Sequence, residues 1–180
     1  MNIKMLNFIM LSAGMAFVSS ASALSANTIE FIGEVSEQTC EVSINGNSST
    51  PVILLPTVRK SELSAAGNTA GETPFTVSVT GCTPDTTKNL DIKTRFVANN
   101  LTSSNRIGNT GDATNVALEI FDPKNPSTLI DMTGATPAPG LVLAQNTAEA
   151  SYDYGVRYYA EGVATAGAVS GSVQYALSYR

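Results

Sequence analysis

The chain has 180 residues, with 10 lysines and arginines against 15 aspartates and glutamates, and therefore a formal net charge of −5. It contains no histidine, which excludes Ser-His-Asp and Cys-His catalysis and any histidine-ligated metal site. The acidic balance, without a cluster of lysines or arginines, also argues against nucleic-acid binding.

The first segment has the pattern of a secretory signal. Residues 1–7 carry one cation, residues 8–18 form an apolar run, and small residues lead to an Ala21-Ser22-Ala23 motif. The apolar run is about half as long as a membrane-spanning helix requires. We therefore predict a signal peptide over residues 1–23, with cleavage after Ala23 or after Ala26, and a mature protein that is not inserted in a membrane.

A short arm, residues 24–39, follows the predicted signal. Within it, residues 28–35 alternate apolar and polar side chains, which is the period of a β-strand. Ile29, Phe31 and Val35 share one face, with Gly33 between them. The arm is therefore predicted to form a strand.

Cys40 and Cys82 are the two cysteines of the chain. In an exported protein, a pair without a third ligand is more typical of a disulfide than of a metal site. The bridge would close a loop of about 42 residues and remove unfolded-state entropy worth about 4 kcal/mol.

The remainder, residues 40–180, reads as one domain of short strands separated by turns rich in Asn, Asp, Gly and Pro. One weak helical turn is predicted within residues 57–66. This pattern predicts a β-sandwich of immunoglobulin type. The predicted strands are 40–44, 52–55, 75–79, 90–97, 116–121, 128–132, 140–143, 150–160 and 168–179.

Two groups of side chains raise alternatives to a purely structural protein. The acidic residues Asp91, Asp112, Glu119 and Asp122 lie on alternating strands or turns, and we interpret them as solvated surface rather than as a catalytic pair. A tyrosine cluster could resemble a sugar-binding platform, but cross-strand and core packing is the favoured interpretation. Its members are Tyr152, Tyr154, Tyr158 and Tyr159.

The last predicted strand runs to the C-terminus with no strand after it. Its apolar face comprises Val169, Gly171, Val173, Tyr175, Leu177 and Tyr179. An ordinary edge strand is one interpretation, although such an edge beside a core exposes backbone donors and apolar surface. The arm likewise has no partner in its own domain. Together the two segments suggest that the arm of one copy completes the sheet of another, in a head-to-tail contact that propagates into a fibre.

Several short motifs, in order along the mature chain, are similar to those of one family. They are residues 28–35 followed by Thr39-Cys40, Leu55-Pro56-Thr57-Val58, Leu63-Ser64-Ala65-Ala66-Gly67, residues 73–77 leading into Gly81-Cys82, residues 116–122, Gly167 fourteenth from the C-terminus, and the penultimate Tyr179. In these features the chain resembles the chaperone–usher pilins, and in particular the major subunits of type 1-like fimbriae.

The resemblance implies an all-β, incomplete immunoglobulin-like sandwich that lacks its final strand. A periplasmic chaperone would lend a strand, and an outer-membrane usher would exchange it for the arm of the next subunit. The implied donor residues are Ile29, Phe31, Gly33 and Val35. The implied acceptor groove and chaperone-binding strand comprise Gly167, Val169, Gly171, Val173, Tyr175, Leu177, Tyr179 and Arg180, with the terminal carboxylate engaging basic residues of the chaperone.

The expected function is that of a non-enzymatic structural subunit, without cofactor or metal, which polymerises with copies of itself or other pilins at the bacterial cell surface. It would form the shaft of a fimbrium, an adhesion organelle. Cleavage after Ala23 would leave 16 residues before Cys40, which is short for a major subunit. A minor adaptor near the fimbrial tip is therefore the alternative.

Overall fold

The computed structural model describes residues 34–36, 38 and 40–179. The predicted signal peptide, Ile29, Phe31, Gly33 and Arg180 lie outside the described residues.

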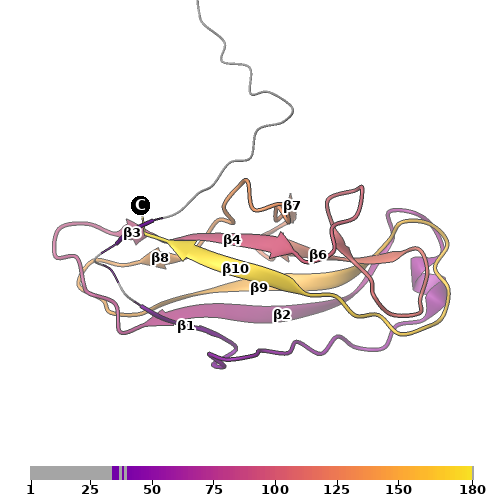
Figure 1. Cartoon of the computed structure of the whole chain (residues 1–180), viewed down its shortest axis with the longest axis horizontal. Coiled ribbons are helices and arrows are strands. Elements are labelled where there is room, and N and C mark those ends of the chain that lie inside the picture. The colour runs from indigo at the N-terminus through magenta and orange to yellow at the C-terminus, as the bar shows by residue number, and fades with distance from the viewer. Residues whose placement is uncertain (1–33, 37, 39, 180) are drawn as a thin grey trace, which may run out of the picture. The chain divides into compact units, whose positions relative to one another are not determined.

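The larger sheet is antiparallel and has the strand order β1-β2-β9-β6-β5, with β7 paired to the end of β6 (Figure 1). Its centre is formed by two long strands whose inward side chains face each other in register, Phe75 opposite Tyr154 and Val77 opposite Tyr152. The strands are β1 (Glu41–Ile44), β2 (Thr69–Thr80), β5 (Ile107–Gly108), β6 (Val116–Asp122), β7 (Asn125–Leu129) and β9 (Ala150–Ala160).

The second layer consists of two smaller antiparallel pairs. One joins β4 (Lys93–Ala98) to β10 (Val173–Ser178), and the other joins β3 (Leu90–Asp91) to β8 (Val142–Leu143). A short 3-10 turn, η1 (Lys60–Leu63), lies within the segment where the sequence predicted a helical turn. The two layers make the predicted all-β, immunoglobulin-like sandwich.

An aromatic cluster joins the layers. The ring of Tyr154 lies 5.7 Å from that of Phe75 on the same sheet and 5.5 Å from that of Phe96 on β4. The Tyr154 hydroxyl donates a 2.9 Å hydrogen bond to the carbonyl of Pro139, so the polar atom of this buried side chain has a partner. Tyr152 and Tyr154 are both buried, which confirms the packing interpretation for these two tyrosines.

Several predicted boundaries change. Residues 52–55 were predicted to form a strand. They are extended, but they pair with no strand among the described residues. The predicted strand 90–97 divides at Ile92, and β10 begins at Val173 rather than at residue 168. The short β5 was not predicted, since two residues are too few to show a periodic pattern.

The prediction that Glu119 and Asp122 are solvated is wrong, because Glu119 is 3% exposed and Asp122 is 8% exposed. The Nε atoms of Arg106 and Arg157 each donate a 2.7 Å hydrogen bond to the Glu119 carboxylate. The two guanidinium groups also lie over aromatic rings, Arg106 over Tyr159 and Arg157 over Phe121. These long side chains cover the outward face of β6 and bury its carboxylate.

Asp122 is buried for a different reason. It accepts a 2.9 Å hydrogen bond from the Tyr152 hydroxyl and a 3.0 Å hydrogen bond from the backbone N–H of Lys124 in the turn between β6 and β7. Burial of the phenol, together with its bond to the Asp122 carboxylate, raises the pKa of Tyr152 to about 12. Asp91 and Asp112 are exposed, as predicted.

Replacing Glu119 by alanine is expected to destabilise the domain by about 3 kcal/mol, because it leaves two mostly buried arginines without their shared carboxylate. Glu72 provides the control, since its carboxylate also pairs with Arg157 but its side chain is 57% exposed. Glu72→Ala should cost at most about 1 kcal/mol. Urea unfolding of the purified subunit, followed by circular dichroism, compares the two. Equal losses would contradict a buried role for Glu119.

Candidate functional site

The backbone of β10 is paired on one side alone. Its residues pair with β4 from Val173 opposite Ala98 to Ser178 opposite Lys93, and among the described residues no strand pairs with its other edge. Near this end, the backbone N–H of Tyr179 donates a 3.1 Å hydrogen bond to the Glu34 carboxylate, and the Tyr179 side chain has a hydrogen bond with the Cys40 backbone. A row of backbone donors and acceptors is therefore available for an added strand.

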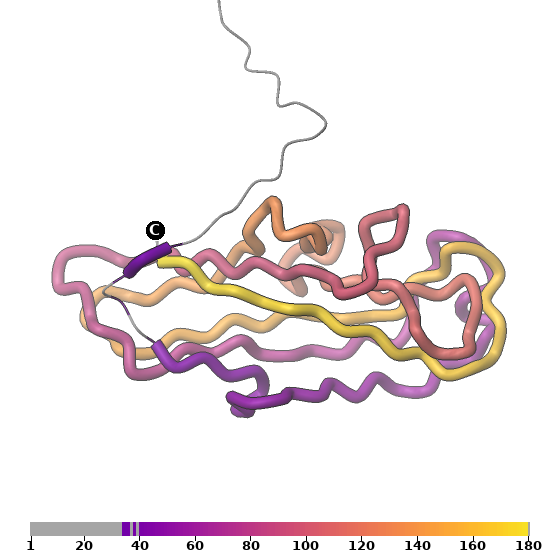
Figure 2. The backbone as a smooth tube through the Cα atoms, viewed as in Figure 1, coloured from indigo at the N-terminus to yellow at the C-terminus, as the bar shows by residue number. Residues whose placement is uncertain are grey.

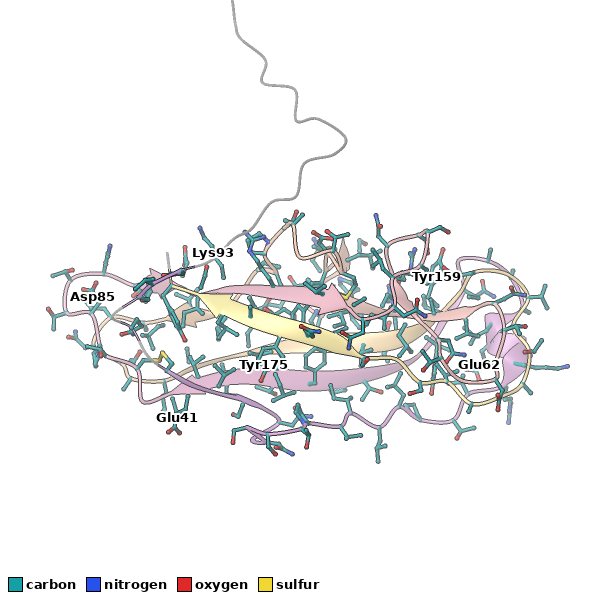
Figure 3. The ribbon with its side chains drawn as sticks, in the orientation of Figure 1. Glu41, Glu62, Asp85, Lys93, Tyr159 and Tyr175 are labelled. Atoms are coloured by element: carbon teal, nitrogen blue, oxygen red, sulfur yellow. A yellow bond between two sulfur atoms is a disulfide. The ribbon has the colours of Figure 1, made fainter. Side chains whose placement is uncertain are left out.

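The side chains that β10 turns toward the core are not sealed. Val173, Tyr175 and Leu177 pack against the main core but remain partly exposed. By contrast, Val77 and Val79 on the opposite sheet are 0% exposed and Phe96 on β4 is 1% exposed. Figure 3 shows Tyr175 projecting from β10 on this side. The core is thus closed at these positions of β2 and β4 but not along β10.

Residues 51–58 form the opposite border of this unsealed region. They are extended and alternate in exposure, with Ile53 and Leu55 turned to the core while Val52 and Leu54 are 77% and 83% exposed. Among the described residues, no backbone hydrogen bond joins 51–58 to another segment. In Figure 2 this segment runs lengthwise along one border of the domain, and β10 runs lengthwise across its middle in the opposite chain direction.

We call the inward side chains of these two segments the open strip: Ile53, Leu55 and Val58 on one side, and Val169, Val173, Tyr175 and Leu177 on the other. All seven are partly exposed and pack against the core. Val58 and Val169 both pack against the same small cluster at one end, so the two borders share an apolar surface there. One border is an unpaired extended segment, and the other is the edge of β10 that pairs with no described strand. An apolar surface between them fits a β-strand with apolar residues on one face.

The structure places the predicted acceptor residues as follows. Val169, Val173, Tyr175, Leu177 and Tyr179 all pack against the core, so they share one face as the alternation predicted. Two glycines allow close approach of the backbone. A Cβ at Gly171 would lie 2.8 Å from Cγ2 of Ile107, and one at Gly167 would lie 2.5 Å from the backbone nitrogen of Ala113.

Asn109 positions the segment that precedes β10, a role that the sequence analysis did not predict. Its carboxamide nitrogen donates to the carbonyl of Ala113 at 2.7 Å, and its oxygen accepts a 2.8 Å bond from the backbone N–H of Ser170. Together with backbone bonds from Ala113 to Ala168 and from Thr110 to Ser170, it holds the segment before β10 in place. The sequence signal was an Asn in a turn, which does not reveal a distant partner.

The root of the arm, by which we mean residues 34–36 and 38, contacts the C-terminal end of β10 through Glu34 and Tyr179. Cys40 and Cys82 form the predicted disulfide. Burial raises the pKa of Tyr179, the Glu34 carboxylate raises it further, and a hydrogen bond with the Cys40 backbone opposes the rise. Val35, the one predicted donor residue that is described, is fully exposed. It therefore makes little contact with its own domain.

The described residues contain no group of three or more His, Cys, Asp or Glu side chains placed to hold a metal ion. They also contain no helix of the length and apolarity needed to cross a membrane.

Comparison with known proteins agrees with this arrangement. The family model described as fimbrial protein matches residues 29–180, and the chain belongs to this family. It is 34% identical to the major fimbrial subunit SMF-1 of Stenotrophomonas maltophilia strain K279a over 172 residues, which cover 89% of this chain and 98% of the relative. It is 32% identical to the F17 fimbrial protein of Escherichia coli, covering 90% of this chain and 92% of the relative.

A minor subunit is also among the relatives. The minor fimbrial subunit HifD of Haemophilus influenzae is 32% identical over 160 residues, covering 84% of this chain and 73% of the relative. Two solved structures are similar in fold, each at 18% identity. A chain of a chaperone–usher pilus has a TM-score of 0.61, with 90% of this chain and 100% of that chain covered. The P pilus rod subunit PapA has a TM-score of 0.59, with coverages of 78% and 99%.

Proposed function

We propose that this fimbrial subunit polymerises by donor-strand exchange and forms the shaft of a fimbrium. The donor is the arm, with Ile29, Phe31 and Val35 as its apolar face and Gly33 at a point of close backbone approach. The acceptor is the open strip, with Val173, Tyr175 and Leu177 receiving the apolar side chains. The single observation that carries the proposal is the partly exposed core between β10 and residues 51–58.

The energies of such an exchange are large. Three apolar side chains removed from water contribute roughly 5–9 kcal/mol. Backbone hydrogen bonds along the added strand contribute about 0.5–1.5 kcal/mol each. Ordering of the arm opposes these gains. The net free energy of binding is still large enough for the contact to dissociate slowly, which suits a fibre under mechanical load.

Before assembly, the same surface would be covered by a periplasmic chaperone that supplies a temporary strand, and an outer-membrane usher would carry out the exchange. The C-terminal carboxylate of Arg180 would contact basic residues of that chaperone. The resulting fibre lies at the bacterial cell surface. Completion of the fold itself would drive assembly.

The alternative role is that of a minor adaptor near the tip. The match covers 98% of the length of the SMF-1 major subunit but 73% of the length of the minor subunit HifD. This difference favours the shaft role. Electron microscopy of cells with and without this chain tests the choice. Loss of entire filaments on deletion is expected for the shaft subunit, whereas filaments that persist in reduced number or without their tips would identify an adaptor.

A further inference from the structure

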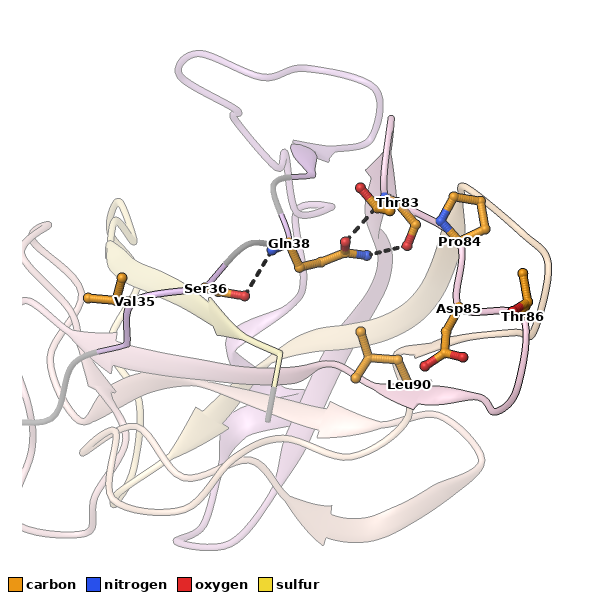
Figure 4. Close-up of a pocket in the computed structure, with 8 residues that line it drawn as sticks. All are labelled: Val35, Ser36, Gln38, Thr83, Pro84, Asp85, Thr86 and Leu90. Carbon is orange, nitrogen blue, oxygen red and sulfur yellow. Dashed lines mark hydrogen bonds between the residues drawn. The ribbon is translucent and has the colours of Figure 1, made fainter.

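The root of the arm borders a surface hollow of about 750 Å³ at the disulfide end of the domain. Figure 4 shows it between the arm root and the loop that follows Cys82, with Pro84 and Leu90 as apolar walls. The other lining residues are Val35, Ser36, Gln38, Thr83, Asp85 and Thr86. Apart from Val35 and Ser36, all of them lie at or beyond Gln38, where the chain is fixed to the domain.

Gln38 is fixed by two reciprocal hydrogen bonds. Its carboxamide nitrogen donates to the carbonyl of Thr83 at 2.9 Å, and its carboxamide oxygen accepts from the backbone N–H of Thr83 at 3.2 Å. The disulfide lies directly beside this clamp. An arm that leaves for another copy is therefore free only up to residue 37.

The tether between two assembled copies is consequently short. The sequence places two residues, 36 and 37, between the proposed donor residue Val35 and the fixed Gln38. A fully extended chain spans about 3.3–3.6 Å per residue, so these positions can be no more than roughly 11 Å apart. Two domains joined by such a tether must abut.

The direction of β10 indicates which ends meet. It begins at Val173, after a segment whose Ala168 and Ser170 carbonyls accept hydrogen bonds from loop 109–115, and it ends at Ser178, next to Tyr179 at the disulfide end. Figure 1 shows η1 at the end opposite the C-terminus. The final strand of an immunoglobulin-like sandwich is antiparallel to its neighbour. The donor therefore ends, and its tether emerges, at the Val173 end of β10, which the chain reaches from loop 161–168.

The far end of the domain is the end that holds η1 and loop 161–168, opposite the C-terminus. There Val163 is the most exposed large apolar side chain, at 67%. Its loop is held firmly, since the Asn115 carboxamide donates to the Val163 carbonyl at 2.9 Å and the Ala164 N–H donates to the Leu63 carbonyl at 3.0 Å. Loop 161–165 is thus a fixed projection with an apolar tip.

We propose that, in the assembled fibre, the Val163 projection of one copy seats against Pro84 and Leu90 of the next copy, the part of the hollow that remains when Val35 and Ser36 leave with the arm. The inference rests on the proposed donor-strand exchange and adds a second contact to it. The occupant is a second copy of this chain, because a tether of at most roughly 11 Å keeps the Val173 end of that copy close to Gln38 and the hollow. The contact fixes the angle between successive subunits.

Cysteine cross-linking in assembled fimbriae tests the contact. Both native cysteines are bridged, so introduced cysteines are the only reactive thiols. Fibres of Val163→Cys, Thr86→Cys are treated with a short bis-maleimide, boiled and run on a denaturing gel. Leu129→Cys, Thr86→Cys is the matched control, because Leu129 is an exposed apolar residue, 44% exposed, on β7. A second pair, Val163→Cys with Thr83→Cys, guards against loss of assembly in the first.

The expected result is a polymer ladder that survives boiling for the Val163 pairs and none for the Leu129 control. A different result is that the wild type gives a ladder before boiling while the Val163 pairs give none that survives boiling. That result would overturn the Val163 contact but would not contradict donor-strand exchange. Absence of any ladder from wild-type fibres would overturn both. Inserting two glycines after Ser36 lengthens the tether by about 7 Å and should reduce the cross-linked fraction while the unboiled ladder remains.

Discussion

Phe31→Asp is expected to abolish the polymer ladder that fimbriae give on an unboiled denaturing gel, while the subunit is still exported. The substitution removes an apolar side chain worth about 1.5–3 kcal/mol on burial. It also places a carboxylate against the open strip, where no cation lies among the seven residues that define it, and an unpaired buried charge costs several kcal/mol. Since about 1.4 kcal/mol changes an equilibrium constant tenfold, the loss is large enough to prevent assembly.

Ile32→Asp is the matched control for this experiment. Ile32 is as apolar as Ile29 and adjacent to Phe31, but the alternation puts it on the opposite face of the arm. It should therefore retain the ladder. A Phe31→Asp subunit that polymerises like the wild type, or an Ile32→Asp subunit that fails equally, would mean that the arm does not donate the predicted face.

The face of the last strand could be predicted from sequence because its alternation is long and uninterrupted. Val173, Tyr175 and Leu177 pack inward as the period of two requires. Packing of Tyr152 and Tyr154 and the bridge between Cys40 and Cys82 were predictable on similar grounds, because residue type and export context limit what they can do. These features depend on local pattern or on chemistry alone.

Other features depend on contacts that no local pattern encodes. Glu119 does point away from the core, as alternation predicts, but Arg106 and Arg157 arrive from other segments and cover it. Gln38 looks like an ordinary polar residue of the arm, and its clamp on Thr83 joins two segments that the neighbouring disulfide also links.

Residues 52–55 show a further limit of sequence patterns. Their alternation correctly indicates an extended segment with Ile53 and Leu55 turned inward. A strand also needs a partner, and the described part of the chain does not provide one beside this segment. The pattern predicts backbone conformation and facing, while pairing is decided by what lies alongside.

The second large effect concerns stability. A subunit that begins at Ser36 keeps the Gln38 clamp and the disulfide but lacks the arm, so its open strip stays exposed to water. A peptide of residues 25–35 should bind this subunit and raise its free energy of unfolding by several kcal/mol, because a ligand that binds only the folded state stabilises it by mass action. The same peptide carrying Phe31→Asp should have little effect.

Urea unfolding of this shortened subunit with and without the two peptides is the most direct test that a neighbouring copy's arm completes the sandwich. We expect a large increase in the unfolding midpoint with the native peptide and almost none with the substituted one. An unchanged midpoint with the native peptide would show that the domain is already complete without the arm.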